Sequence, residues 1–134
     1  MYSEKIMEEF LDPKNYGVIK GATAVGKTIS DMGSEIIKIF IKVEDNKIVD
    51  CKFQTFGGVV AIALTSFATN MMLGRTILGA KRIMPEDLIE KAGEIPEEKK
   101  YIVNLVISTI DKVIDSYESK AKKGGDAVEE EVAD

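Results

Sequence analysis

Two segments with alternating apolar residues, joined by a short polar connection, constrain the fold of this chain more than any other feature. In residues 35–43, apolar side chains recur at every second position, which is typical of a strand with one buried face. Residues 48–56 alternate in the same way. One face of this second strand is expected to carry Val49, Cys51 and Phe53. Because residues 44–47 are polar and few, the sequence predicts a β-hairpin.

Helices are predicted on both sides of the hairpin in the chain. Residues 3–11 have helical apolar spacing with Ser3 as N-cap, and residues 59–73 follow two glycines and are apolar on every side. A short helix over 86–91 follows Pro85, and a long one is expected from Pro96 to about Ser119. Residues 18–32 are rich in Gly, Thr and Ser and could form one short edge strand. This order predicts an α+β fold with helices packed on a sheet face.

The charge distribution divides the chain into a domain and a tail. The 134 residues carry 18 basic and 23 acidic side chains, a net charge of −5, and the last fourteen account for −3 of it. Residues 1–119 are therefore expected to form one domain, and 120–134 a charged tail too poor in apolar residues to order itself. Since the domain has no basic excess, no nucleic-acid partner is expected.

The side-chain inventory excludes several classes of site. The chain has no histidine and one cysteine, Cys51, so it can form neither an internal disulfide, nor a zinc finger, nor a histidine-dependent catalytic site. No enzymatic activity is expected. Cys51 has apolar neighbours two residues away on each side, which favours a buried structural thiol. A sulfur-acceptor enzyme would instead need this thiol to be exposed.

No targeting or membrane segment is visible in the sequence. The first residues lack the pattern of a secretory signal, and the one charge-free stretch, 53–73, is interrupted by polar residues and glycines. A cytoplasmic protein without a membrane association is therefore expected.

A complete match to the phosphate-binding loop pattern occurs at residues 21–28. The pattern residues are Gly21, Gly26, Lys27 and Thr28. In a nucleotide-binding protein a buried strand precedes this loop and a helix follows it, whereas here a turn-like segment precedes it and a strand is expected to follow. Nucleotide binding is therefore one alternative, and a glycine-rich segment around an edge strand is the simpler interpretation.

Several segments resemble the IscU and NifU N-terminal iron–sulfur cluster scaffold family. The opening, residues 2–6 and 12–17, is similar to that of the family, and residues 53–57 with 61–63 are similar to its segment after the second strand. Ile95, Pro96, Lys99 and Leu105 are similar to the start of its last helix. This resemblance runs over residues 1–119. It implies a three-stranded antiparallel sheet with helices packed around it.

The resemblance also implies a ligand site, but its cysteines are missing from this chain. Family members hold a nascent cluster through three cysteines, with an aspartate and often a histidine. The positions equivalent to these ligands and their neighbours are Gly33, Glu35, Gly58, Tyr101 and Ile102. The family cofactor would be an iron–sulfur cluster or zinc, both of which require mainly thiolate or imidazole ligands. No cofactor is therefore expected here.

These observations lead to one principal hypothesis and two alternatives for the site. The protein is expected to be scaffold-like, unable to hold a cluster alone, and to act through a cysteine desulfurase, another scaffold or a chaperone. The family's chaperone-binding segment implies partner contacts at Ile95, Pro96 and Lys99. One alternative is iron or cluster binding through Glu35 and Tyr101 with thiolates supplied by a partner. The other is a small apolar cavity capped by these two residues that binds a ligand, rather than a pocket that is simply filled.

Overall fold

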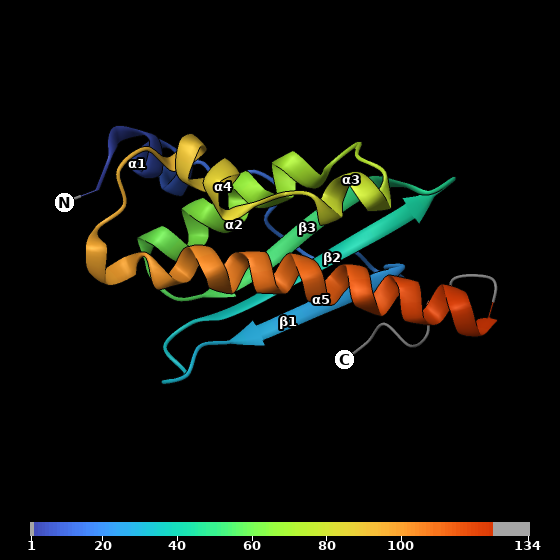
Figure 1. Ribbon diagram of the computed structural model, residues 1–134. Helices are drawn as coiled ribbons and strands as arrows, with labels where there is room; N and C mark the ends of the chain where they lie inside the picture. The colour runs from blue at the N-terminus through green and yellow to red at the C-terminus, as the bar shows by residue number, and fades with distance from the viewer. Residues whose placement is uncertain (1, 125–134) are drawn as a thin grey trace.

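The computed structural model describes residues 2–124, and it has the α+β fold expected from the sequence. Its elements along the chain are α1 (Glu4–Leu11), β1 (Ala24–Ile29), β2 (Ile36–Glu44), β3 (Lys47–Phe56), α2 (Val59–Met72), α3 (Ile77–Lys81), α4 (Pro85–Ala92), the 3₁₀ turn η1 (Glu97–Lys99) and α5 (Tyr101–Gly124) (Figure 1). Within these residues the strands form one antiparallel sheet in the order β1-β2-β3. The expected three-stranded sheet is thus confirmed.

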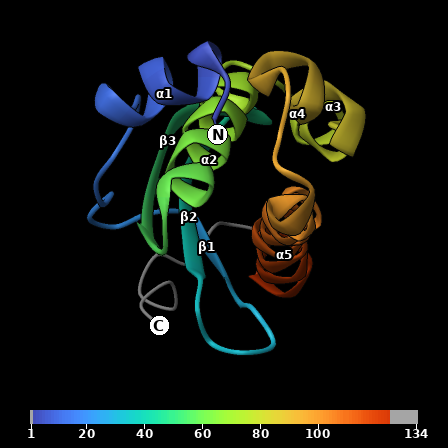
Figure 2. The same cartoon turned by 90° about the vertical axis from the view of Figure 1, so that its left-hand side faces the viewer.

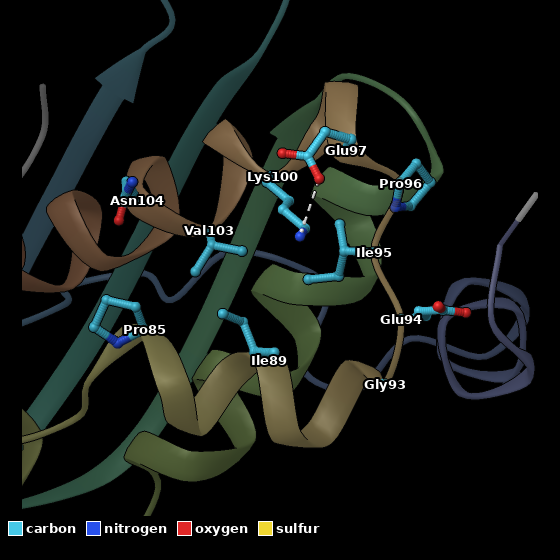
Figure 3. A pocket seen from close by; sticks show the side chains of 10 residues that line it. All are labelled: Pro85, Ile89, Gly93, Glu94, Ile95, Pro96, Glu97, Lys100, Val103 and Asn104. Carbon is cyan, nitrogen blue, oxygen red and sulfur yellow. Dashed lines mark ion pairs between the residues drawn. The ribbon is translucent and has the colours of Figure 1, made fainter.

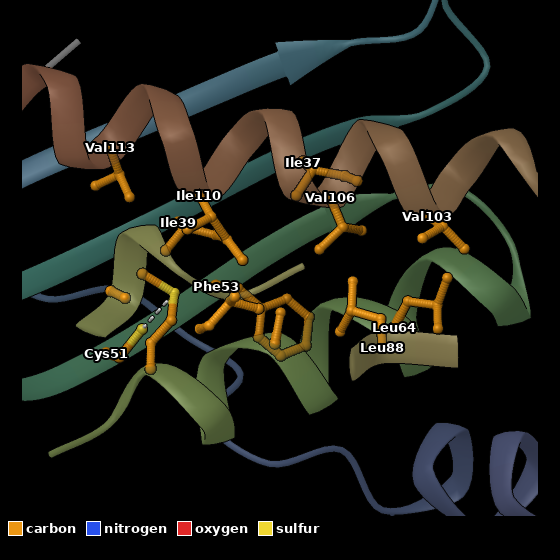
Figure 4. Packing of buried hydrophobic residues seen from close by; sticks show 14 of the residues in the cluster. Ile37, Ile39, Cys51, Phe53, Leu64, Leu88, Val103, Val106, Ile110 and Val113 are labelled. Carbon is orange, nitrogen blue, oxygen red and sulfur yellow. Dashed lines mark hydrogen bonds between the residues drawn. The ribbon is translucent and has the colours of Figure 1, made fainter. Parts of the chain in front are cut away.

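The helices pack on the sheet in a way that creates one continuous core. Helix α5 lies along β1 and β2, α2 lies on β3, and α1 and α4 pack against α2 (Figures 1 and 2). The apolar faces of these elements meet in one cluster, in which Phe53 of β3 lies between strand and helix side chains (Figure 4). The buried α5 residues include Ile102, Val106, Ile110, Val113 and Ile114, as its helical spacing predicts.

The predicted hairpin is present, but one side chain points the other way. Val43 pairs with Ile48 and Lys42 pairs with Asp50, so Val49 is an additional residue in β3 at a β-bulge. The prediction that Val49 faces inward was wrong, because the bulge interrupts the alternation and leaves this side chain 46% exposed. Beyond the bulge, Cys51 and Phe53 are buried as expected.

The phosphate-loop pattern does not form a phosphate loop. Gly21 lies in a turn, and Gly26, Lys27 and Thr28 all lie within β1, the predicted edge strand, where a nucleotide-binding loop would require the start of a helix. The hydroxyls of Thr28 and Thr109 are hydrogen-bonded to each other in the interior. The nucleotide-binding hypothesis is therefore contradicted by the backbone geometry.

Helix boundaries account for the remaining differences. Pro96 precedes the 3₁₀ turn η1, and the long helix α5 starts only at Tyr101. It extends to Gly124, so the first five residues of the expected tail are helical, and residues 125–134 lie outside the described part of the chain. Helix α3 was not predicted. Within residues 2–124, no helix has both the length and the apolar content needed to cross a membrane.

Candidate functional site

Three segments meet at the end of the sheet where the ligand-equivalent positions lie. Gly33 occupies the turn between β1 and β2, and Glu35 directly precedes β2. Gly58 is the N-cap residue of α2, while Tyr101 and Ile102 are the first two residues of α5. The fold therefore brings together residues that are far apart in the sequence, as the family resemblance implies.

The carboxylate of Glu35 is the centre of this site. The residue is only 3% exposed. The Tyr101 hydroxyl donates a hydrogen bond of 2.6 Å to Glu35 Oε2, and Ser34 Oγ donates one of 2.8 Å to Glu35 Oε1. The backbone N–H of Glu35 donates to Ser30 Oγ at 3.0 Å. Both carboxylate oxygens are thus already occupied by donors from the same chain.

The hydrogen bonds decide the protonation state of this pair. Burial by itself raises the pKa of Glu35, but the donors Tyr101, Ser34 and Ser30 and the positive charge of Lys99 outweigh it, so the pKa lies below its ordinary value of 4.5. The same hydrogen bond to Glu35 raises the pKa of Tyr101, with burial as a smaller cause. At neutral pH the site therefore contains an ionised carboxylate held by a neutral phenol.

The glycines around the carboxylate have different surroundings. A Cβ on Gly57, whose φ is +154°, would lie 3.0 Å from Glu35 Cγ, so this residue must remain small for the carboxylate to keep its position. A Cβ on Gly33 or Gly58 would meet no atom within 4 Å. Ile102 is buried in the core. Of the three positions that the family resemblance equates with cysteines, Gly33 and Gly58 are therefore open, and Ile102 fills the third with an apolar side chain.

The donor set does not fit an iron–sulfur cluster or zinc. Within residues 2–124 there is no group of three His, Cys, Asp or Glu side chains that could hold a metal ion. Cys51 is fully buried in β3 with its Sγ 3.9 Å from the sulfur of Met72, and burial raises the pKa of its thiol. The thiol is therefore neither part of the site nor exposed in the way a sulfur acceptor requires.

A groove of about 660 Å³ lies between α4 and the start of α5 (Figure 3). Two of the predicted partner-binding residues, Ile95 and Pro96, line it, whereas Lys99 is not among the lining residues. Sequence reasoning missed Ile89 and Val103, which contribute apolar side chains from the facing helices. Their helical spacing indicates apolar faces but not which helix lies opposite. Sequence reasoning also missed Ser30 and Ser34 at the Glu35 site, because their hydroxyls belong to no recognisable sequence motif.

A family model connects this geometry to known proteins. The model described as the NifU-like N-terminal domain matches residues 1–124. The chain belongs to this family. This NifU-like domain is 39% identical over 123 residues to the iron–sulfur cluster assembly scaffold protein IscU 1 of Archaeoglobus fulgidus, covering 92% of this chain and 80% of that protein.

Further relatives of this NifU-like domain agree in sequence and in fold. The iron–sulfur cluster assembly scaffold protein IscU of Aquifex aeolicus is 35% identical, with 97% of this chain and 88% of that protein covered. Among solved structures, the N-terminal part of a NifU-like protein from Brucella abortus has a TM-score of 0.62 at 20% identity, covering 89% of this chain and 95% of that chain. At this identity the structural likeness shows the common fold.

Proposed function

We propose that this protein takes part in iron–sulfur cluster assembly without holding a cluster on its own side chains, and that it acts through protein partners. One observation carries the proposal: Tyr101 and Ser34 donate hydrogen bonds to the two carboxylate oxygens of Glu35. The positions that the family resemblance equates with the cysteine ligands carry Gly33, Gly58 and Ile102. The family membership supports a role in iron–sulfur cluster assembly. The replacement of cysteine at the ligand positions supports the loss of cluster binding.

Coordination chemistry explains why a partner is needed. Iron–sulfur clusters are held mainly by cysteine thiolates, and structural zinc by thiolates and imidazoles. This chain offers one thiol, which lies in the core, and no imidazole. A second copy of the chain would add only one more buried thiol. A resident cluster would therefore need ligands from another protein.

The groove between α4 and α5 is the surface that best supports partner binding. Ile89, Ile95 and Val103 give it apolar walls, and Pro96 stands at its edge (Figure 3). Lys99 lies in the adjoining turn η1. We infer that a cysteine desulfurase, another scaffold or a chaperone contacts this region, with Ile95, Pro96 and Lys99 at or near the contact.

A metal and sulfide assay tests the first part of the proposal. Protein purified and reconstituted without oxygen is expected to remain colourless, with no stoichiometric iron or acid-labile sulfide. As a control, the triple variant Gly33→Cys, Gly58→Cys, Ile102→Cys is expected to gain zinc or iron binding, because thiolates return to the ligand positions. Circular dichroism must show that this variant folds, since Gly33 has a φ of +74° and Ile102 is buried.

The result that would contradict the proposal is a coloured wild-type protein with bound sulfide. If absorption from sulfur-to-iron charge transfer arises only when a partner is present and Glu35→Ala weakens it, then Glu35 and Tyr101 supply oxygen ligands beside partner thiolates. That outcome would contradict the proposal that the site holds no metal, because the carboxylate would have to exchange its hydrogen bonds from Tyr101 and Ser34 for a bond to the metal.

A binding assay with the cognate cysteine desulfurase tests the partner surface. The wild-type chain is expected to bind, and Ile89→Asp is expected to weaken binding about tenfold or more, because it places a charge among apolar groove walls. Ile89 is 43% exposed, so this substitution leaves the core intact. Leu78→Asp is the matched control, since Leu78 is also exposed but does not line the groove. Absence of wild-type binding would count against a desulfurase partner.

A further inference from the structure

Strand β1 has one long edge that pairs with no other strand of the described chain. It is the outermost strand of the sheet, next to β2 (Figure 1). Within residues 2–124, no backbone hydrogen bond joins the edge of β1 turned away from β2 to another segment. Unpaired N–H and C=O groups on such an edge are a template for pairing with a further strand. The residues along the edge indicate which strand fits.

The register identifies the backbone groups that point outward. The N–H of Ser30 donates to the carbonyl oxygen of Glu35 directly opposite, at 2.9 Å. Hydrogen-bonded pairs alternate along an antiparallel ladder, so every second residue back from Ser30 also bonds to β2. The residues between them are Val25, Lys27 and Ile29. Their N–H and C=O groups therefore point away from the sheet.

The side chains of these three outward-bonding residues lie on the sheet face away from α5. Strand side chains alternate, and the intervening residues of β1 face the helix. Ile29 is 54% exposed and begins an apolar row, in which it lies opposite Ile36 and Ile36 lies opposite Phe56. Phe56 is 66% exposed. An apolar residue that an added strand places beside Ile29 would extend this row and cover part of it.

Lysines occupy the middle of the edge strand and of its neighbour. Lys27 lies directly opposite Lys38, although like charges opposite each other on a sheet are destabilising. Within residues 2–124, neither lysine takes part in an ion pair. The Lys38 Nζ lies over the Phe40 ring, 5.4 Å from its centroid. A carboxylate on a strand beside β1 would relieve the repulsion, because it would lie opposite Lys27.

We propose that β1 pairs antiparallel with an extended acidic segment of a partner protein, which continues the antiparallel three-stranded sheet by one strand. The segment places an apolar, an acidic and an apolar residue opposite Ile29, Lys27 and Val25, which matches the edge in charge and polarity. Its intervening residues are small, because α5 lies so close to β1 that a Cβ on Gly26 would be 2.5 Å from the Val113 nitrogen.

A second copy of the chain fits this edge less well than an acidic segment. Antiparallel pairing of two β1 strands over residues 25–29 would place the two copies of Lys27 opposite each other, and like charges there are destabilising. The inference uses neither the Glu35 side chain nor the groove between α4 and α5. It therefore stands or fails independently of the proposed function.

Hydrogen exchange with a synthetic peptide tests strand addition to the wild-type chain. The probe is the peptide Ser-Val-Ser-Glu-Ser-Ile-Ser with blocked ends, added at millimolar concentration. Near saturation, we expect exchange of the Lys27 and Ile29 N–H groups to slow about fivefold or more, because they become hydrogen-bonded. Exchange at Gly26 and Thr28 should change much less, since their N–H groups already bond to β2.

Modified peptides separate backbone pairing from contact through side chains alone. In an antiparallel pair the glutamate N–H faces β1, so N-methylation there should weaken binding about tenfold or more. The N–H of the serine before it points away from β1, and N-methylation of that serine should leave the affinity nearly unchanged. Replacing the glutamate by lysine should weaken binding about fivefold, because it places a third positive charge beside Lys27 and Lys38.

Charge reversal on the protein completes the test. Lys27→Glu, Lys38→Glu is expected to reverse the preference, so that the lysine peptide binds better than the glutamate peptide. Lys91→Glu, Lys122→Glu changes two exposed lysines on helices and should keep the wild-type preference.

Three results would overturn the proposal: no slowing of exchange at Lys27 and Ile29, equal binding of the two methylated peptides, or no reversal of the charge preference. Protection of the same N–H groups without peptide, rising with protein concentration, would overturn it as well, because a second copy would then occupy the edge.

Discussion

The Gly26→Ala variant is expected to lose about 1–3 kcal/mol of unfolding free energy, the usual cost of forcing extra volume into a packed interior. Gly26 faces α5 from the middle of β1. A Cβ built on it would lie 2.5 Å from the backbone nitrogen of Val113 and 2.8 Å from its Cα. Since these are backbone atoms, no side-chain rotation can relieve the contact, and the helix would have to move away from the strand. Gly26→Val is expected to lose more unfolding free energy than Gly26→Ala, because its side chain is larger.

Urea unfolding followed by circular dichroism measures this effect. Gly58→Ser is the matched control, because the added side chain meets no atom within 4 Å and serine is a favoured N-cap residue. We expect the control to unfold at the wild-type midpoint or slightly above it. An unchanged midpoint for Gly26→Ala would show that α5 does not approach β1 as closely as described. The second glycine of the phosphate-loop pattern is thus explained by helix packing.

The Tyr101→Phe variant is expected to lose about 1–2 kcal/mol at pH 7, because the Glu35 carboxylate loses a hydrogen-bond donor at a buried position. This loss lies at the lower end for a hydrogen bond to a charged group, because Tyr101 is 45% exposed and water weakens the interaction. No apolar contact is removed by the change. The loss therefore reports on the hydroxyl alone.

The pH dependence gives this prediction a second readout. The pKa of Glu35 is lowered on folding, so its contribution to stability is present above 4.5 and is lost as the pH falls through the folded-state value. The pKa of Tyr101 is raised on folding, so its contribution is present below 10 and is lost as the pH rises through the folded-state value. The difference between wild type and variant should therefore be greatest between these two limits.

Unfolding midpoints at acidic, neutral and alkaline pH measure this difference. Tyr117→Phe is the control, because Tyr117 also lies on α5 but makes no side-chain hydrogen bond within residues 2–124. If Tyr101→Phe and Tyr117→Phe have equal effects at neutral pH, the phenol does not hold the carboxylate. A difference that does not shrink at low pH would contradict the assignment of an ionised Glu35.

Local signals in the sequence were sufficient for most of the secondary structure. Ser3 caps α1 as expected, with its Oγ accepting from the backbone of Ile6, and Pro85 and Gly93 bound α4. These features depend on a few neighbouring residues, and so a local pattern captures them. The bulge at Val49 was missed because it depends on how β2 and β3 pair, which alternation alone does not specify.

The amino-acid sequence alone determined which ligand side chains are absent: the chain has one thiol and no imidazole, whereas iron–sulfur clusters are held mainly by cysteine thiolates. It also indicated the order of the strands and of the helices other than α3, because apolar spacing and helix caps are local. Only the tertiary structure decided that the Tyr101 hydroxyl donates a hydrogen bond to Glu35, 66 positions away. It also decided that α5 packs so close to Gly26 that no side chain fits there. Such contacts depend on long-range packing, in which each residue's surroundings are set by elements distant in the chain.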